Sequence, residues 1–266
     1  MSRFDNKVIW ITGASSGIGE ATAYEFAKSN VKLVLSARRK EELERVKKAT
    51  GLPEEHVLVL PMDVEKIEEF DVLTKSVIDK FGQIDILFNN AGISQRSFVL
   101  ETDISVFKKI LDIDLLSVIA LSKSVLPYMV ERKSGHIAAT SSVAGIVATP
   151  GRSAYAAAKF GVIGFYDALR AEVYKYNIHV TVICPGYIKT DISKNALSPD
   201  GSKYGKMDSN QMNGISSAEC AKQILSGIYQ KKNQVFIGGF RELGGVFLKR
   251  LFPRILSKIV RKQAPK

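Results

Sequence analysis

The sequence is poor in cysteine and has no long apolar run. Its 266 residues contain two cysteines, Cys184 and Cys220, which are too few for a disulfide framework, so a reducing, cytoplasmic compartment is expected. No stretch of about 18 apolar residues is present, which argues against a membrane-spanning helix. The three histidines (His56, His136, His179) lack the spacing of metal ligands, so we expect no metal.

Acidic residues are outnumbered, but unevenly along the chain. Lys and Arg total 38 against 27 Asp and Glu, a net charge of +11. Eight of the basic residues and a single acid, Glu242, lie in residues 241–266. Because the rest of the chain is only mildly basic, a nucleic-acid-binding protein is not expected.

Short apolar runs alternate with longer helical patterns. The predicted strands are residues 7–12, 31–37, 57–62, 84–89, 136–141, 178–184 and 234–237, and the predicted helices are residues 17–29, 40–50, 67–81, 103–130, 153–176 and 218–230. We expect the fourth helix to be broken or bent near Pro127. The alternation predicts a single-domain α/β fold, a doubly wound parallel sheet of about seven strands of the Rossmann type.

A glycine-rich turn follows the first predicted strand and leads into the first helix. Its residues are Gly13, Ser15, Ser16, Gly17, Ile18 and Gly19. Glycines allow a tight turn and close approach of the backbone to a pyrophosphate, and the helix N-terminus offers unpaired N–H groups. The position between a strand and a helix therefore predicts a dinucleotide-binding site rather than a structural turn.

The second predicted strand ends without an acidic residue. In dinucleotide folds an acid at this point binds the ribose 2′-hydroxyl and repels a 2′-phosphate. Arg38 and Arg39 stand here instead, and Arg38 can make a charge-assisted contact with that phosphate. We therefore predict NADP(H) in preference to NAD(H). The alternative is that both arginines only lead into a solvated helix.

A tyrosine and a lysine lie one helical turn apart. Tyr155 and Lys159 share one face of the predicted helix 153–176. The neighbouring ammonium favours the phenolate form of the tyrosine, which suits Tyr155 to proton transfer. Ser142, at a strand end, can hydrogen-bond the reacting oxygen. Alone, a Tyr–Lys pair is typical of a helix surface; with the glycine turn and Ser142 it predicts a catalytic site.

These motifs resemble those of the short-chain dehydrogenase/reductase family, in the family's order. The remaining matches are Asn89-Asn90-Ala91-Gly92 and Pro185-Gly186 with Ile188 and Thr190. The stretches GHIAATSSVAG and ICPGYIKT are most similar to the dehydrogenase/reductase member 7 group and its bacterial relatives. The resemblance implies a cofactor-binding set that adds Asp63, Val64, Asn90, Ala91, Gly92, Pro185, Gly186, Ile188 and Thr190 to the glycine turn, Arg38, Tyr155 and Lys159.

One position departs from the family pattern. Asp114 stands where the family has an asparagine whose backbone carbonyl holds a water near the lysine, and Ser117 replaces a glycine. A main-chain carbonyl is retained in an Asn-to-Asp change, so the relay is expected to persist. The extra carboxylate is expected to favour a protonated lysine.

The motifs together predict an NADPH-dependent reductase, reversible as an alcohol dehydrogenase, that transfers hydride between nicotinamide and a carbonyl or secondary alcohol. A regulatory or sensor protein that binds NADP(H) with little turnover is the alternative. A lid over residues 190–216 is expected to line the substrate pocket. Arg96 and Arg152 are also expected there, either binding a carboxylate or phosphate or remaining exposed without a ligand.

We divide the chain into a dinucleotide-binding and catalytic domain, residues 1–240, and a basic amphipathic extension, residues 241–266. The extension alternates apolar and basic residues and is interrupted by Pro253. We expect it to pack on the protein or on a partner subunit, and binding to a membrane surface is the alternative. An apolar flap near the pocket suits a hydrophobic or lipid-like substrate. The resemblance implies a homodimer or homotetramer.

Overall fold

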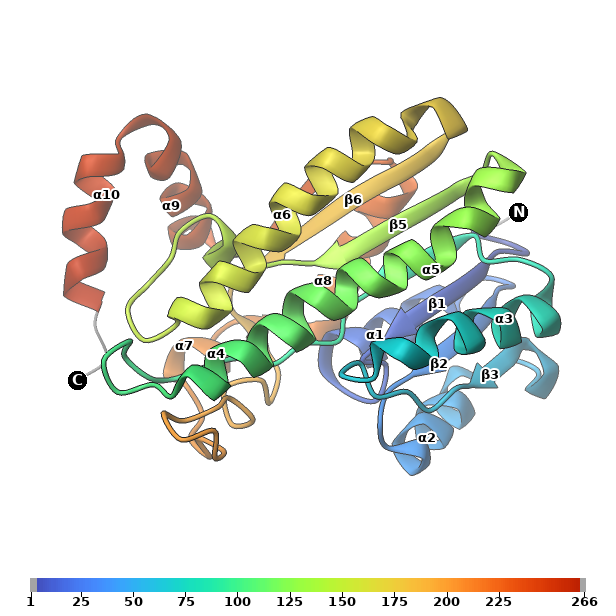
Figure 1. Cartoon of the computed structure of the whole chain (residues 1–266), viewed down its shortest axis with the longest axis horizontal. Coiled ribbons are helices and arrows are strands. Elements are labelled where there is room, and N and C mark those ends of the chain that lie inside the picture. The colour runs from blue at the N-terminus through green and yellow to red at the C-terminus, as the bar shows by residue number, and fades with distance from the viewer. Residues whose placement is uncertain (1–3, 264–266) are drawn as a thin grey trace.

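The computed structural model describes residues 4–263, apart from the side chains of Arg241 and Gln263. Its centre is a seven-stranded sheet in the order β3-β2-β1-β4-β5-β6-β9, with every neighbouring pair parallel (Figure 1). The strands are β1 (Val8–Thr12), β2 (Lys32–Ser36), β3 (Val57–Val59), β4 (Ile86–Asn89), β5 (Gly135–Thr140), β6 (Ile178–Pro185) and β9 (Gln234–Ile237). The predicted doubly wound α/β fold is confirmed. Residues 1–3 and 264–266 of the two predicted segments lie outside the described residues.

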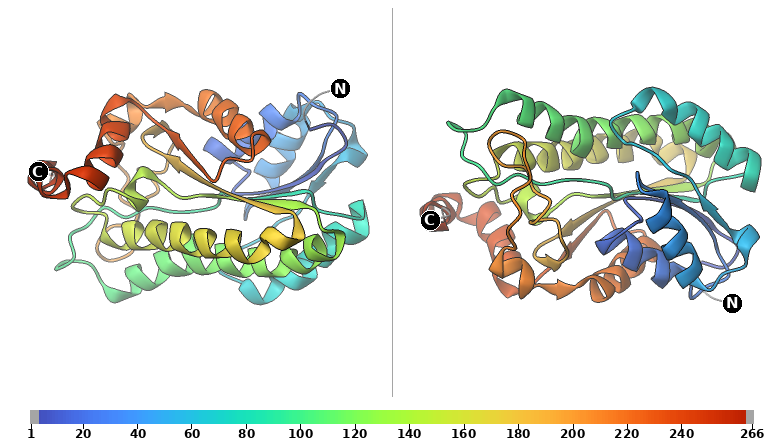
Figure 2. Two further views of the ribbon diagram at one scale, coloured as in Figure 1. Left: turned by 90° about the horizontal axis from the view of Figure 1, so that it is seen from above. Right: turned by 90° about the horizontal axis from the view of Figure 1, so that it is seen from below.

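Helices cover both faces of the sheet (Figures 1 and 2). On one face lie α1 (Gly17–Phe26), α2 (Lys40–Thr50) and α8 (Ser217–Tyr229), which share a buried cluster with alternate strand residues. On the other lie α3 (Phe70–Phe81), α5 (Ser117–Arg132) and α6 (Ser153–Val173). Because helices cover both faces, β1 is buried throughout, and this explains why its sequence is an almost continuous apolar run. Trp10 and both cysteines are buried among them.

The long helix expected over residues 103–130 is not broken at Pro127, so a break at that residue is ruled out. Instead α4 (Ile104–Leu111) passes through a π-helical turn, Asp112–Leu116, into α5, which contains Pro127. Val125 and Met129 are buried on either side of the proline and hold α5 against the sheet. In the π turn the Ser117 N–H bonds to the Asp112 carbonyl, five residues back. Such widened turns are rare and frequently mark functional sites.

The segment predicted as a lid is more ordered than a loop. Near its two ends β7 (Ile188–Lys189) pairs with β8 (Ile215–Ser216), and α7 (Ser209–Met212) precedes β8. Leu197, within the segment, bridges both Gln95 and Lys203. The backbone of this segment is therefore tied to the loop that follows β4.

The C-terminal extension forms two helices that project at one end of the molecule (Figure 2). They are α9 (Phe240–Leu251) and α10 (Pro253–Val260), and Pro253 takes the first position of α10, where a missing N–H costs nothing. Leu256 is buried, whereas the other large apolar side chains are exposed to differing degrees: Phe240, Leu243, Phe247, Leu251, Phe252, Ile255 and Ile259. Within residues 4–263, no helix has the length and apolar character needed to cross a membrane.

Candidate active site

The glycine turn lies directly against the segment that follows β4. Gly13 has a φ of +65°, a left-handed conformation that favours glycine, and a Cβ at this position would lie 2.9 Å from the Ala91 Cα. A Cβ on Gly19 would collide with the Gly13 carbonyl. The Thr12 hydroxyl accepts hydrogen bonds from the Asn90 and Ala91 N–H groups at 2.9 and 3.0 Å. Two of the predicted cofactor-binding segments are therefore held together by one side chain.

The turn also meets the loop that follows β6. A Cβ on Gly17 would lie 3.1 Å from the Thr190 Cγ2, so the start of α1 and the Ile188–Thr190 segment are in contact. A Cβ on Gly186 would lie 2.9 Å from the Cγ of Glu242, in the first turn of α9. The C-terminal extension thus begins beside the Pro185-Gly186 motif, in agreement with the expectation that it packs on the protein.

The residues predicted for the adenine end lie at the ends of β2 and β3. The Met62 N–H donates to the Ala37 carbonyl at 3.0 Å. Arg38 and Asp63 each come directly after one of these two hydrogen-bonded residues. Arg38 is exposed, and Asp63 and Val64 are partly buried. Of the remaining predicted residues, Ser15, Pro185 and Ile188 are buried, Ile18 is partly buried, and Ser16 and Gly92 are exposed.

Arg45 is a neighbour of the glycine turn that the sequence did not single out. From α2 its guanidinium donates to the Ser15 carbonyl at 3.3 Å and pairs with Glu20 of α1 at 2.7 Å. The pair ties α2 to the helix that begins at the turn. Arg45 belongs to a run of charged residues typical of a solvated helix, so no sequence signal distinguished it.

The three predicted catalytic residues come from neighbouring elements. Ser142 follows β5; its hydroxyl donates to the Pro185 carbonyl at 3.3 Å and accepts from the Ala144 N–H at 3.1 Å. Tyr155 and Lys159 are both buried in α6, with the lysine Nζ 5.6 Å from the centre of the tyrosine ring. The Ser141 hydroxyl donates to the Lys159 carbonyl at 2.8 Å, which fixes the end of β5 against α6.

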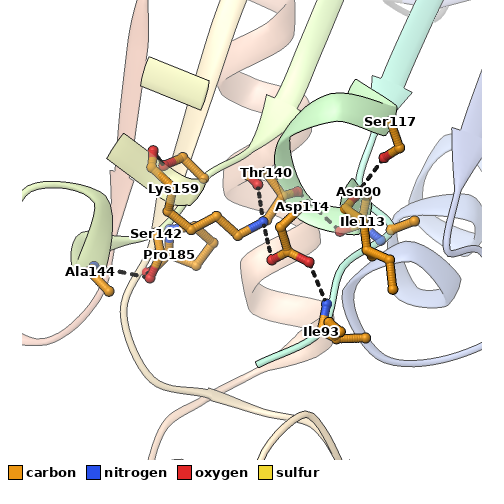
Figure 3. Close-up of polar contacts among 12 residues, drawn as sticks. Asn90, Ile93, Ile113, Asp114, Ser117, Thr140, Ser142, Ala144, Lys159 and Pro185 are labelled. Carbon is orange, nitrogen blue, oxygen red and sulfur yellow. Dashed lines mark hydrogen bonds and ion pairs between the residues drawn. The ribbon is translucent and has the colours of Figure 1, made fainter. Parts of the chain in front are cut away.

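The Asp114 side chain is directed at Lys159 (Figure 3). One carboxylate oxygen lies 3.1 Å from the Lys159 Nζ, and the other accepts the Ile93 N–H at 2.8 Å. Asp114 is fully buried. The sequence had assigned a role to the backbone carbonyl of this residue, whereas the structure shows a direct ion pair through its side chain.

The ion pair shifts both pKa values. Burial is the largest single influence and alone would lower the pKa of Lys159, but the charges of Asp114 and Tyr155, together with the contact to the Asp114 carboxylate, raise it. This direction confirms the predicted effect of the extra carboxylate. Burial raises the pKa of Asp114, against the opposing effects of Lys159 and the Ile93 N–H. Removing one partner by substitution would leave the other as an isolated buried charge.

Lys159 retains one N–H after these contacts. An ammonium has three donors. One is directed to the Thr140 carbonyl at 3.0 Å and a second to Asp114. The third is available for a hydroxyl group, which is the chemistry that binding a ribose or assisting a phenol requires.

Comparisons with known proteins find relatives over most of the chain. The family model described as short chain dehydrogenase matches residues 7–200. The dehydrogenase/reductase SDR family protein 7-like of Anopheles gambiae is 43% identical, over 98% of this chain and 84% of its own length. Dehydrogenase/reductase SDR family member 7 of Homo sapiens is 40% identical, over 86% of this chain and 69% of its own.

Solved structures show the same fold. A short chain dehydrogenase/reductase from Burkholderia phymatum, crystallised in complex with NAD, superposes with a TM-score of 0.83 at 23% identity and covers 96% of each chain. A short-chain dehydrogenase from Streptomyces avermitilis gives a TM-score of 0.82 at 26% identity, over 97% of this chain and 96% of its own.

Proposed function

Since the chain belongs to the short-chain dehydrogenase/reductase family and is an oxidoreductase of that family, we propose that it is an NADPH-dependent carbonyl reductase, reversible as an alcohol dehydrogenase. The observation that carries the proposal is the grouping of Ser142, Tyr155 and Lys159 beside the glycine turn and the Pro185-Gly186 loop. A hydrophobic or lipid-like carbonyl compound, or the corresponding secondary alcohol, is the proposed substrate.

The glycine turn fits a dinucleotide. Only glycine fits at Gly13 and Gly19 because their would-be Cβ atoms meet the protein's own backbone, and the tight turn they form leads into the N-terminus of α1, whose N–H groups suit a pyrophosphate. The rest of the predicted set would hold the adenine, the riboses and the nicotinamide. Arg38 supports the 2′-phosphate form because it is exposed at the end of β2 where an acid would repel phosphate. We expect Arg38→Asp to reduce the ratio of NADP to NAD affinity by about tenfold or more; an unchanged ratio would contradict the assignment.

The bound cofactor supplies the hydride, and the chain's own residues manage the proton and the reacting oxygen. Tyr155 donates its phenolic proton to the carbonyl oxygen as the alcohol forms, and removes it in the reverse direction. Ser142 orients that oxygen through its hydroxyl. Lys159, held charged by Asp114, stabilises the phenolate that remains on Tyr155 and offers its third N–H to a ribose hydroxyl.

A panel of ketones assayed through NADPH absorbance tests the function. Tyr155→Phe keeps the ring and removes the acid, so we expect kcat to fall by about 10²- to 10⁴-fold. Tyr176→Phe, at the far end of the helical segment, is the matched control and should leave kcat unchanged. Cofactor binding without turnover of any ketone or alcohol would favour the alternative, a regulatory or sensor protein.

For the C-terminal extension we propose contact with an anionic membrane surface. Several large apolar side chains of α9, of α10 and of the junction between them are exposed, among them Phe247 and Phe252, and the same helices carry Lys249, Arg250, Arg254 and Lys258. Phe247→Ser with Phe252→Ser should reduce sedimentation with phosphatidylserine vesicles. If these changes instead dissociate a homodimer or homotetramer measured by light scattering, the extension is a subunit interface.

A further inference from the structure

We infer that Arg96 and Arg152 form a binding site for an anionic group of the substrate, a carboxylate or a phosphate, and that Asp208 occupies this site when the substrate is absent. The inference rests on the proposed function, because it concerns the substrate of that same reaction. Three loops supply the residues: Arg96 follows β4, Arg152 precedes α6, and Asp208 precedes α7 in the segment predicted as a lid.

The backbones of these loops are joined to one another. The Arg96 N–H donates to the Leu197 carbonyl at 2.9 Å, and the Ser97 N–H donates to the Gly151 carbonyl at 3.2 Å. Ser97 and Arg152 also form an isolated parallel bridge. The two arginines therefore hold fixed positions relative to each other, as a preorganised anion site requires.

The charges of the cluster do not balance. Arg96 lies 2.6 Å and Arg152 3.5 Å from the same carboxylate oxygen of Asp208. The three side chains are only 10%, 16% and 21% exposed, which excludes the expectation of two exposed arginines without a ligand. Two guanidinium groups share one carboxylate, so a net positive charge and several N–H donors remain in a partly dry site.

The direction in which the pKa of Arg96 is shifted agrees with an excess of positive charge in the cluster. Burial, followed by the neighbouring charge of Arg152, lowers the pKa of Arg96, and Asp208 opposes the shift without cancelling it. A second anion would stabilise both guanidinium groups. A bidentate carboxylate or phosphate matches the planar geometry of guanidinium better than one shared oxygen does.

The cluster lies next to the proposed chemistry. Arg152 immediately precedes α6 and is one helical turn before Tyr155. Its guanidinium is 5.9 Å from the ring centre of Tyr187, the residue that follows the Pro185-Gly186 motif. We therefore expect one substrate molecule to place its anionic group at Arg152 and its carbonyl beside Tyr155. Asp208 belongs to the lid segment, so an incoming anion would displace the lid's own carboxylate.

Matched pairs of ketones test the inference on the full chain with NADPH. One pair is a keto acid and its methyl ester; the other is a hydroxyketone phosphate and its free alcohol. For at least one pair we expect the anionic member to have a KM about tenfold lower or more. The pair that shows the preference identifies carboxylate or phosphate as the recognised group, and no preference in either pair would overturn the inference.

Two substitutions separate anion binding from a structural role. Arg96→Gln and Arg152→Gln should each raise KM for the anionic member by about tenfold or more and leave KM for the neutral member unchanged. Arg96→Lys keeps a charge and should lose part of the effect. Lys123→Gln, at an exposed position of α5 outside the three loops, is the matched control. Equal losses for both members of a pair would overturn the inference.

The Asp208→Asn variant distinguishes competition with the substrate anion from a purely structural role, because the two predict opposite changes in KM for the anionic member of a pair. If Asp208 competes with the substrate anion, removing its charge should lower KM for the anionic member. If the cluster only closes the lid, the variant should impair both members equally, which would overturn the inference.

A binding measurement separates failure of this inference from failure of the proposed function. Calorimetric titration of the chain with the preferred anionic ketone should show binding that Arg96→Gln weakens, whether or not any ketone is reduced. Binding without turnover would leave the anion site intact and contradict the reductase. Turnover of neutral and anionic ketones with equal KM would leave the reductase intact and contradict the anion site.

Discussion

Two buried carboxylates lie at opposite ends of β4, and their surroundings differ. Asp85, just before the strand, accepts from the Val8 N–H at 2.9 Å and from Gln83 at 2.8 Å, and pairs with Arg132 at 3.1 Å and Lys7 at 3.3 Å. Asp114, beyond the other end, has the Ile93 N–H and Lys159. The amino end thus surrounds its carboxylate with several donors from three segments.

The two ends of β4 differ in role: the contacts of Asp85 stabilise the fold, and the contacts of Asp114 prepare a site for a ligand. The partners of Asp85 join the start of β1, the start of β4 and the end of α5, and the two cations reach solvent. Asp114 instead holds a buried lysine whose third N–H remains available. In open parallel sheets ligands bind at the carboxyl ends of the strands. The amino end can therefore be fully satisfied, while the carboxyl end keeps one donor for a ligand.

The largest expected effect on stability comes from removing the partner of the Asp114 carboxylate. Lys159→Met removes the ammonium and leaves an uncompensated buried carboxylate, so we expect the free energy of unfolding to fall by about 3–5 kcal/mol in urea denaturation. The double variant Lys159→Met with Asp114→Asn removes both charges and should recover most of the loss. A double variant no more stable than Lys159→Met would show that the two side chains are not coupled.

A smaller loss, without a loss of chemistry, is expected at the opposite end. Asp85→Asn removes the charge that faces Arg132 and Lys7 and should lower the free energy of unfolding by about 2 kcal/mol. The kcat of the folded enzyme should not change. Reduced kcat with unchanged stability would contradict the division between the two ends.

The amino end should also govern acid sensitivity. The backbone N–H of His136 donates to the backbone carbonyl of Asp85. The pKa of the His136 side chain is lowered to about 3, first by burial and then by the charges of His179 and Lys231. The unfolded chain binds a proton near the ordinary value of 6.5 and the folded chain does not. Stability is therefore complete above pH 6.5 and falls by about 1.4 kcal/mol per pH unit as the pH drops from 6.5 towards 3.

His136→Gln is the control for that pH dependence. The substitution removes the titrating group, so the difference in unfolding free energy between the wild type and the variant should shrink as the pH falls below 6.5. A difference that stays constant from pH 7 to pH 5 would exclude His136 as the source.

Much of the fold was predictable because the relevant signals are local. Strands covered on both faces are continuously apolar. The glycine turn is recognisable from the spacing of its glycines between a predicted strand and a predicted helix. The Ser142, Tyr155 and Lys159 trio was recognisable from spacing and order. The expected break at Pro127 was wrong because buried neighbours on both sides hold α5 in place, and the interruption occurs at the π turn around Asp114 instead.

Local sequence determined the parallel α/β architecture, the glycine turn and the residues on one face of α6, because each depends on neighbours along the chain. The tertiary structure decided which charges meet. Asp114 reaches Lys159 only because a π turn in one helix faces another helix across the end of β4, and Asp208 reaches Arg96 and Arg152 only because three loops converge. Charges so distant in sequence carry no periodic signal, and burial sets their strength.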